Sequence, residues 1–216
     1  IVITGTTDRP LLRIDAGSGA VHRLDLWLPP AWGCSTADVR AREVFSMRHP
    51  QGFSTAASIL YRIDVDGGRI LRRVSYAELA FAASVADGEP LDVSHCGLIL
   101  AGGLLYRTLA RTGSDYVIVA LDPETLDLVR VLTVPLEPGR LVASAPLPYA
   151  PAGALIMAGP PVDQYGQPIA GSYRLLGFDL GTGAALPQLD MEIPRGGLFM
   201  VDRGTRAYLL SSARRL

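Results

Sequence analysis

A short phrase recurs four times along this chain, and it limits the fold more strongly than any other feature. In each copy an apolar run ends at an aspartate, a five-residue turn follows, and a second strand-like run begins. The copies are Leu11–Val21, Leu60–Ile70, Ile118–Leu128 and Leu175–Ala185, and their aspartates are Asp15, Asp64, Asp122 and Asp179. The aspartates are 49, 58 and 57 residues apart, which predicts a row of similar units.

We interpret each aspartate as the first residue of a tight turn, in preference to a member of a shared carboxylate cluster. Its carboxylate can accept hydrogen bonds from the backbone N–H groups just ahead of it, as in an Asx turn. Glycine stands four residues after the aspartate in three copies (Gly19, Gly68 and Gly183), where the chain needs a positive φ to enter the return strand. Leu126 stands there in the third copy, so we predict a different geometry for that turn.

A second motif, a glycine followed by an apolar run and a small residue, occurs between the copies. It is found at Gly97–Gly102, Gly153–Gly159 and Gly204–Ser212. Each unit then has a strand, a variable loop, the aspartate-ended strand, the tight turn and a third strand. A short apolar stretch supplies the fourth strand (Leu141–Ala145 and Gly197–Val201). The predicted units are residues 1–47, 48–96, 97–152 and 153–203, and residues 204–216 begin a further inner strand.

Four strands in a unit of roughly 40–60 residues are typical of the blades of a β-propeller. One such sheet cannot cover both of its faces by itself, whereas sheets stacked around an axis cover each other. The sequence therefore predicts an all-β fold, a β-propeller of four-stranded antiparallel blades with about four blades present. Because a surplus inner strand follows the units, we expect part of a larger propeller. A closed four-bladed ring and a β-sandwich whose hairpins are similar by chance are the alternatives.

Three segments between the repeats have patterns of their own. Residues 21–28 alternate between polar and apolar side chains, which predicts a half-buried strand. Residues 31–43 are interpreted as a loop or a helical turn. Ser75 and Glu78 have the spacing of a capping box and predict a short helix after them, with a strand over residues 80–85 as the alternative.

The repeated phrase, together with Val201–Ser211, resembles the blades of quinoprotein-like and YVTN-type β-propellers. Those blades contain an apolar strand, then Asp-x-x-Thr-Gly, then another apolar strand. The resemblance implies a propeller fold and the group's role as exported recognition or scaffold modules. In the quinone-cofactor dehydrogenases of this group, a tryptophan stands eight residues after the aspartate. This chain has Arg23, Arg72, Arg130 and Pro187 there, so the resemblance implies no cofactor of that kind.

Charge and cysteine usage narrow the classes of partner and compartment. The net charge of −1 favours neither nucleic acid nor an anionic membrane as a partner. Residues 141–162 carry no charge, but five prolines interrupt the run, so we predict no transmembrane helix there. Cys34 and Cys96 fit no metal-ligand spacing, and we expect either one long-range disulfide in an exported protein or two buried thiols.

The patterns of histidine, serine and carboxylate residues assign no catalytic, cofactor-binding or metal-binding residue. His22, His49 and His95 are widely separated, and no two of them have the spacing of a metal-ligand pair. The neighbours in Ser94–Cys96 would point to opposite faces of a strand. The segment Asp64–Gly68 is similar to the start of a calcium loop but lacks the further acidic ligands, so we interpret it as a turn.

Two groups of residues are candidates for contacts with other molecules. Four arginines recur on the strand repeats and are interpreted either as a solvated face or as a ring of like charge along a channel: Arg13, Arg62, Arg72 and Arg73. The connections between an inner strand and the aspartate-ended strand are candidate binding loops, because loops on a rigid scaffold commonly carry function. Residues 103–115 contain Tyr106, Arg107 and Arg111, and residues 160–172 contain Asp163 and Tyr165.

We therefore expect a non-catalytic β-propeller that serves as a binding or structural subunit of an exported or cell-surface assembly. Its expected partners are other protein subunits, and its expected location is extracellular or periplasmic. The alternative is a propeller enzyme, lactonase-like or dehydrogenase-like, with its site at the central channel. That alternative needs acidic or histidine side chains at the inner strands, which here are apolar and small (Ile99–Ala101 and Leu155–Met157).

Overall fold

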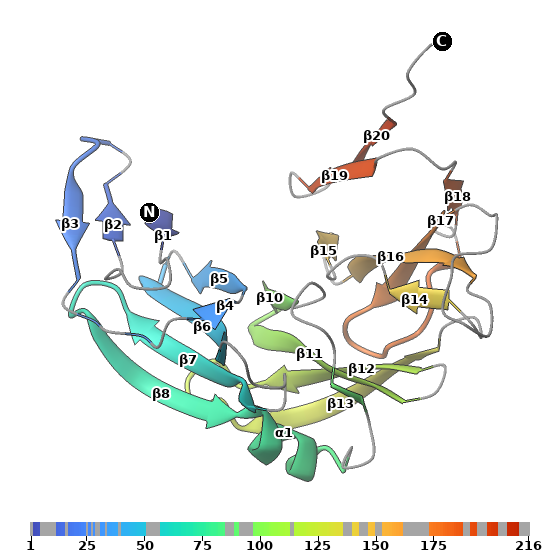
Figure 1. Cartoon of the computed structure of the whole chain (residues 1–216), viewed down its shortest axis with the longest axis horizontal. Helices are drawn as coiled ribbons and strands as arrows, with labels where there is room; N and C mark the ends of the chain where they lie inside the picture. Colours follow the sequence, from blue (N-terminus) through green and yellow to red (C-terminus); the bar gives the residue numbers. More distant parts are fainter. Residues whose placement is uncertain are drawn as a thin grey trace.

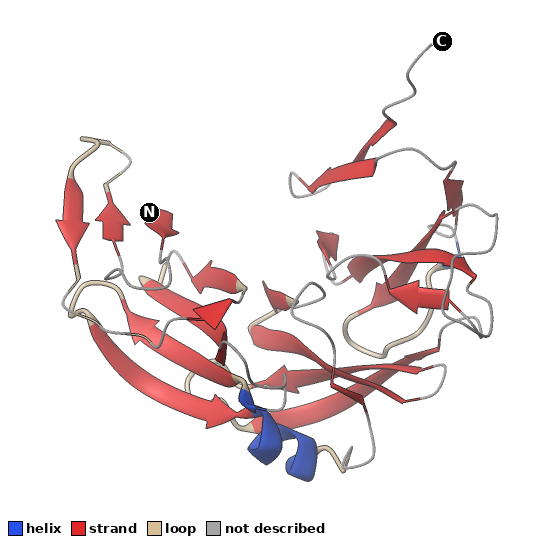
Figure 2. Cartoon of the chain, in the orientation of Figure 1, coloured by secondary structure: helices blue, strands red, loops and turns tan. Residues whose placement is uncertain are grey.

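A computed structural model of the chain describes most of its repeats. The described residues are 2–4, 12–15, 17–24, 26, 28, 31–32, 34–38, 40–50, 57–84, 89–90, 97–112, 115–135, 140–142, 147–149, 153–161, 173–187, 191–193, 198–202 and 207–211. In this part of the chain the regular elements are strands, apart from the single helix α1 (Tyr76–Ala82) (Figure 2).

The described strands form five antiparallel sheets that follow each other in sequence order. The first sheet contains β1 (Val2–Thr4), β2 (Leu12–Ile14) and β3 (Val21–Arg23). The second contains β4 (Ala31–Trp32), β5 (Ser35–Asp38), β6 (Glu43–Pro50), β7 (Ile59–Asp64) and β8 (Arg69–Ser75). The third contains β9 (Glu89–Pro90), β10 (Leu98–Ala101), β11 (Leu104–Thr112), β12 (Asp115–Leu121) and β13 (Leu128–Pro135). The fourth contains β14 (Arg140–Val142), β15 (Leu147–Tyr149), β16 (Gly153–Pro161), β17 (Tyr173–Asp179) and β18 (Met191–Ile193), and the fifth contains β19 (Leu198–Asp202) and β20 (Ala207–Ser211).

The second, third and fourth sheets share one plan. Each is an antiparallel meander of four strands: β5–β6–β7–β8, β10–β11–β12–β13 and β15–β16–β17–β18. A short extra strand (β4, β9 or β14) pairs with the second strand of each meander. The predicted all-β fold built of four-stranded antiparallel sheets is confirmed.

The sheets are arranged along an open arc, with the chain passing from one end of the arc to the other (Figure 1). The first strands of successive meanders lie side by side, since β10 contacts both β5 and β15, and β15 contacts β19. The last strands, β8 and β13, lie on the outer side of the arc (Figure 1). Each sheet therefore runs from an inner strand to an outer strand.

The third sheet is buried on both of its faces. Along β12, the side chains of Val117, Val119 and Leu121 enter a core shared with the second sheet. The alternate residues Tyr116, Ile118 and Ala120 enter a second core, shared with Phe178 and Leu180 of the fourth sheet. Successive side chains of a strand point to opposite faces, so a strand that is apolar from Tyr116 to Leu121 needs a covering layer on each side. The neighbouring sheets supply both layers.

The sheets divide the chain differently from the predicted units. Strand β6 crosses the predicted boundary between residues 47 and 48, and β14 pairs within the fourth sheet although the residues after 140 were expected to end the third. Likewise β19 pairs with β20, and not with the fourth sheet.

Of the three segments predicted between the repeats, the helix is confirmed and the other two differ from the prediction. The helix is confirmed, because α1 begins at a complete capping box in which Ser75 Oγ accepts the Glu78 N–H and Glu78 accepts the Ser75 N–H. Residues 31–43 contain the strand β5, which replaces the predicted loop or helical turn. Of the described residues between 21 and 28, Val21–Arg23 are in a strand, whereas Leu24 and Leu26 are buried outside it.

The four aspartates each bind the backbone of their own turn. In each turn Oδ1 of the aspartate accepts the N–H three residues on, from Ser18, Gly67, Thr125 or Thr182. Three of the aspartates also accept the N–H two residues on. These are the hydrogen bonds of an Asx turn, and they satisfy donors that the strand ladder cannot reach.

The third turn has the same geometry as the others, so the prediction of a different one is wrong. Leu126 has a φ of 61°, close to 72° at Gly19 and 76° at Gly183. Its N–H donates to the Asp122 carbonyl at 2.8 Å, as the N–H groups of both glycines do to their own aspartates. Leucine adopts this left-handed conformation at a cost of about 1–2 kcal/mol, and its burial at 2% exposure provides the compensating contact.

Arginines of one sheet hold the aspartate turn of the next. Arg13 forms an ion pair with Asp66 at 3.0 Å, Arg62 donates to the Glu124 carbonyl, and Arg72 donates to the Thr125 carbonyl at 3.0 Å. In the third sheet Arg130 donates to the Leu180 carbonyl at 3.1 Å. Arg13 and Arg62 are partly buried and bridge neighbouring sheets, so neither predicted interpretation, a solvated face or a charged channel, is correct for them. Arg72 bridges two sheets but is exposed, and Arg73 is exposed as well, as the solvated-face interpretation predicts.

A β-bulge places two of these arginines. The pairing of β7 with β8 shifts register so that Arg72 lies opposite Arg62, and the pairing of β12 with β13 shifts in the same way so that Arg130 lies opposite Ala120. The extra residues, Leu71 and Val129, are left unpaired on the outer strands. Both arginines stand eight residues after the aspartate, and the bulge orients that position toward the next sheet.

The Asx turns predict a specific acid sensitivity. The backbone N–H three residues on makes the largest contribution to lowering the pKa of Asp15, Asp64 and Asp122 below the ordinary value of 3.8. Below pH 3.8 the unfolded chain therefore binds more protons than the folded one, and stability falls as pH decreases. We expect Asp122→Asn to be less stable than the wild type at neutral pH, with the difference shrinking as pH falls below 3.8.

The measurement is the urea midpoint as a function of pH. Asp127→Asn is the matched control, because among the described residues the Asp127 carboxylate accepts no backbone N–H. A difference between Asp122→Asn and the wild type that stays constant through the acidic range would contradict the assignment.

Candidate functional site

The first predicted binding loop is a strand. Residues 104–112 form β11, which pairs with β10 on one side and with β12 on the other. Tyr106 and Arg107 are 4% and 1% exposed, so neither is available at the surface; Arg111 lies on the same strand. The expectation of a loop is wrong because the glycines at 102 and 103 form a tight hairpin with positive φ at both positions, and the chain returns at once as a strand.

Arg107 is a buried cation between the second and third sheets. Its guanidinium lies over the ring of Tyr76, the first residue of α1. The guanidinium carbon is 5.8 Å from the centre of that ring. Within the described structure its Nε and Nη1 atoms have no hydrogen-bond partner. Burial lowers the pKa of Arg107 to about 10, so the group remains charged at neutral pH.

Tyr106, the neighbour of Arg107 on β11, points to the opposite face of the third sheet. Its hydroxyl accepts a hydrogen bond from Arg130 Nη2 at 2.8 Å, and the guanidinium carbon of Arg130 lies 6.0 Å from the centre of its ring. Because Arg130 also binds the Leu180 carbonyl, Tyr106 helps to hold the fourth turn. Both residues expected to contact a ligand thus belong to the interfaces between sheets.

The structure describes only some of the remaining residues that were predicted to have a role. Asp163 and Tyr165 lie outside the described residues. Cys34 is disulfide-bonded and packs against the core between the second and third sheets; Cys96, the other cysteine of the sequence, lies outside the described residues, and the pairing of the two stays a prediction.

The two described histidines, His22 and His49, lie on different sheets. His22 is exposed on β3, whereas His49 on β6 is buried and its Nδ1 is hydrogen-bonded to Ser58 Oγ. Ser58 is fully buried as well, so this serine–histidine pair is a core contact. Among the described residues, no group of three or more His, Cys, Asp or Glu side chains is arranged to hold a metal ion. No helix in the described part of the chain is long and apolar enough to cross a membrane.

A cleft opens on the outer side of the arc, between the second and third sheets. It has a volume of about 210 Å³. One wall comes from the end of β8 and from α1, and the other comes from the third aspartate turn and the start of β13. The lining residues are Arg72, Arg73, Val74, Glu78, Leu79, Ala82, Thr125, Leu126, Asp127 and Leu128. We call this feature the outer cleft.

The turn residue Leu126 distinguishes this interface from the two others that have a described aspartate turn. At the other two interfaces the equivalent residue is glycine, and the turn approaches its neighbour closely. A Cβ on Gly183 would lie 3.3 Å from the Thr133 carbonyl oxygen, and a Cβ on Gly68 would lie 3.8 Å from the Leu24 side chain. Leu126 instead contributes a large buried side chain to the core that includes Leu79 of α1.

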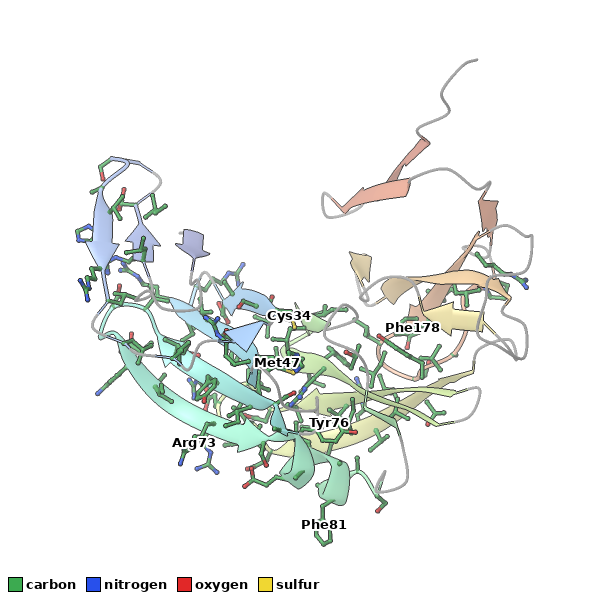
Figure 3. The ribbon with its side chains drawn as sticks, viewed as in Figure 1. Cys34, Met47, Arg73, Tyr76, Phe81 and Phe178 are labelled. Atoms are coloured by element: carbon green, nitrogen blue, oxygen red, sulfur yellow. The ribbon has the colours of Figure 1, made fainter. Side chains whose placement is uncertain are left out.

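The polar side chains of the outer cleft differ in how many hydrogen bonds they already make. The Glu78 carboxylate is held by the capping box, and the Ser75 backbone N–H, together with the Ser75 hydroxyl and the charges of Arg73 and Arg72, lowers the pKa of Glu78. Arg72 uses its Nε atom to hold the third turn. Within the described part of the chain, the Arg73 guanidinium forms no hydrogen bond or ion pair, and it projects outward from β8 (Figure 3).

Sequence reasoning missed this cleft, although two signals of it are present. The capping box at Ser75 and the leucine at position 126 are two departures from the repeat, and α1 and Leu126 both line the cleft. Each was visible in the sequence as a separate local feature. Their meeting across 50 residues of chain depends on how the second and third sheets stack.

Comparisons with known proteins give matches to solved structures only. No family model matches the chain, and no curated protein matches it. The chain is similar to a europium-containing methanol dehydrogenase, with 20% identity and a TM-score of 0.42, over 72% of this chain and 26% of the other. It is similar to a quinohemoprotein alcohol dehydrogenase from Pseudomonas putida HK5, with 16% identity and a TM-score of 0.40, over 67% of this chain and 18% of the other.

A third match is a quinohemoprotein alcohol dehydrogenase from Comamonas testosteroni, with 20% identity and a TM-score of 0.38, over 75% of this chain and 22% of the other. The chain thus spans 18% to 26% of the length of these proteins. Two of the three are quinohemoproteins by name. We transfer no residue role from them.

The left-handed leucine gives an unusual order of mutant stabilities. Leu126→Ala removes buried contacts and keeps the strained φ, so we expect a loss of about 2–5 kcal/mol in the free energy of unfolding. Leu126→Gly removes the same contacts but relieves the strain, and we expect its loss to be about 1 kcal/mol smaller. Chemical denaturation measures both values. The same pair of substitutions at Leu79, inside α1, has the opposite expected order, because glycine is the poorer helix former.

The buried Arg107 and the partly buried Arg130 are expected to respond oppositely to replacement by methionine. Arg107→Met removes a buried charge with few partners and keeps its packing volume, so stability should stay within about 1 kcal/mol of the wild type or rise. Arg130→Met leaves the Leu180 carbonyl and the Tyr106 hydroxyl without their donor, and we expect a loss of about 2–3 kcal/mol. Thermal or urea unfolding measures the comparison, and an equal loss for both variants would show that Arg107 has partners of comparable strength.

Proposed function

We propose that this chain is a β-propeller that acts as a non-catalytic binding or structural subunit of an exported or cell-surface assembly. The observation that carries the proposal is the third sheet, whose two faces are both covered by neighbouring sheets of the same plan. Sheets stacked in this way leave their turns and outer strands as the available contact surfaces. Such surfaces on a rigid stack are suited to binding other molecules.

The order of the strands supports a radial arrangement of blades. Every complete meander begins at an inner strand that touches the inner strand of the next sheet, and ends at an outer strand. The described sheets then form an arc of one propeller, and we favour a larger propeller over a closed four-bladed ring. In that arrangement the arginines that bind the next turn connect neighbouring blades through hydrogen bonds and ion pairs.

Most of the recurring polar residues make hydrogen bonds or ion pairs within a turn or between neighbouring sheets. The aspartates bind their own turns, and Arg13, Arg62, Arg72 and Arg130 bind the turn of the next sheet. Two of the four positions occupied by tryptophan in the quinone-cofactor group hold arginines that are engaged in these bridges, Arg72 and Arg130. β10, which lies between two other inner strands, carries only aliphatic side chains. These features favour a binding module over an enzyme with a central site.

The outer strands and the helix supply a surface for a partner. Leu71, Val129 and Val131 on the outer strands are 37%, 52% and 40% exposed, and Phe81 on α1 is 86% exposed. Aromatic and aliphatic side chains in such positions are typical anchors of protein interfaces. The disulfide at Cys34 fits an oxidising compartment outside the cytoplasm, which supports an exported location.

The test uses the full-length protein purified under native conditions from the cells that make it. Native mass spectrometry should show a stable complex with at least one other polypeptide. Assays with alcohols, sugars and lactones, run in parallel with metal and quinone analysis, should show no turnover. A protein that is monomeric, or one that turns over a substrate with a stoichiometric metal or quinone, would contradict the proposal, and the second result would establish the enzyme alternative.

A further inference from the structure

We propose that two copies of this chain associate through their outer clefts, with Phe81 of each copy packed into the outer cleft of the other. The inference goes beyond the proposed function, because it concerns a contact between identical chains and does not depend on another kind of subunit. It is carried by the exposed aromatic residue beside the cleft, by the apolar floor of the cleft and by the balance of charge around it.

The exposed apolar side chains of the described residues are concentrated on a few elements. The large ones all lie on α1 or on the last strand of one of the first three sheets: Val21, Ile70, Leu71, Phe81, Val129 and Val131. Of these elements, β8, β13 and α1 lie on the outer side of the arc (Figure 1). A concentration of exposed apolar side chains on one side of a protein is typical of an interaction surface.

Phe81 is the most exposed of these side chains, at 86%. Helix α1 packs against the protein through Tyr76, Leu79 and Ala80, which are buried, whereas Phe81 projects away from the protein (Figure 3). The next residue, Ala82, lines the outer cleft. The ring therefore stands beside the cleft without filling it, and a second molecule is needed to remove it from water.

The outer cleft has the size and the floor to receive one large side chain. Its volume of about 210 Å³ lies below the ~300–1,000 Å³ of sites that enclose drug-sized ligands. In its lining Leu79 and Leu126 are both 2% exposed. Val74 and Leu128, which also line it, are half-buried. An aromatic ring that enters such a cleft exchanges water for apolar contacts, and aromatic side chains of this kind are common anchors of protein interfaces.

The charges around the cleft match a second copy of the same surface. Arg72 on β8 reaches toward the third sheet, and Asp127 belongs to the aspartate turn on the opposite wall. Glu78 is held by the capping box. Arg73 stands opposite Tyr61, on the other face of the second sheet, and lies only at the rim of the cleft. The lining thus contains two basic and two acidic residues, which disfavours a partner that carries one sign of charge.

A two-fold axis that runs along the cleft brings its opposite walls together. Such an axis places the same patch of both copies in contact, so the wall of β8 and α1 in one copy faces the turn wall in the other. Arg72 of one copy then meets Asp127 of the other, and Phe81 lies over the cleft of the other copy. Each contact occurs twice. The net charge of −1 adds little repulsion between the copies.

Direct pairing of two β8 edges is a less favourable contact between copies. β8 carries Arg69, Arg72 and Arg73 and no acidic residue, so two antiparallel β8 strands would bring like charges together. The bulge at Leu71 also interrupts the edge of this strand. A contact through the cleft avoids both problems.

Sedimentation velocity of the full-length protein at increasing concentration measures the association. We expect a dimer, and we expect Phe81→Asp to raise its dissociation constant by about tenfold or more, because the substitution removes the anchor of both contacts. Val21→Asp is the matched control, since Val21 is an apolar residue with 60% exposure on β3 of the first sheet. It should change the dissociation constant by less than about twofold. Circular dichroism and urea midpoints verify that each variant is folded.

A mixing experiment tests whether Phe81 enters the cleft. Ala82→Trp fills the mouth of the cleft and keeps Phe81, whereas Phe81→Asp lacks the ring and keeps the cleft open. Each variant alone has neither contact, so each should sediment as a monomer at concentrations where the wild type is a dimer. An equimolar mixture of the two should form a heterodimer, because one of its two contacts has both the ring and an open cleft.

Four results would overturn the proposal. They are a wild type that is monomeric at about 100 μM, equal weakening by Val21→Asp, a mixture that stays monomeric, and growth beyond the dimer, since a two-fold contact closes. A complex with a different polypeptide that Phe81→Asp dissociates, found without a homodimer, would also overturn it and would assign the cleft to that polypeptide. A homodimer that contains no other kind of subunit supports this contact, whereas the proposed function, which expects other protein subunits, then fails.

Discussion

A β-sheet that is apolar on both faces is stable only between two other layers, and the rest of this structure depends on that requirement. The third sheet meets it by sharing one core with the second sheet and another with the fourth. Burial of this kind is strong but has no direction, since hydrophobic contact alone does not set the angle or the register between sheets. The directional contacts come from polar groups, and in this chain most of them are arginines.

The aspartate turns and the arginines form one system. An aspartate orders its turn by accepting backbone N–H groups, which leaves carbonyl groups such as those of Glu124, Thr125 and Leu180 directed outward. Arginines of the preceding sheet then donate to these carbonyls. The β-bulge in the outer hairpin orients Arg72 and Arg130 toward the next sheet, so a backbone irregularity, and not the residue type alone, determines the contact. The outer cleft lies at the interface where this plan is modified by a helix and by Leu126.

Much of the fold could be predicted from the sequence, and the errors have physical causes. The Asx turns and the capping box are local interactions between residues two or three apart, so sequence spacing is enough to predict them. The geometry of the turn at Leu126 was mispredicted because tertiary burial compensated a conformational cost that local preference treats as decisive. Residues 103–115 were mistaken for a loop because Arg107 and Arg111 resemble surface residues in sequence, whereas Arg107 lies buried over Tyr76.

By itself, the sequence determined the period of the repeat, the aspartate turn, the start of the helix and the absence of the tryptophan typical of the quinone-cofactor group. These features depend on short-range spacing and on residue identity. Only the tertiary structure decided which strands form one sheet, which arginines bind the next turn and where a cleft remains open. Arg72 and Thr125, or Leu79 and Leu126, are about 50 residues apart in the chain, and their contacts exist only because stacking brings successive sheets together.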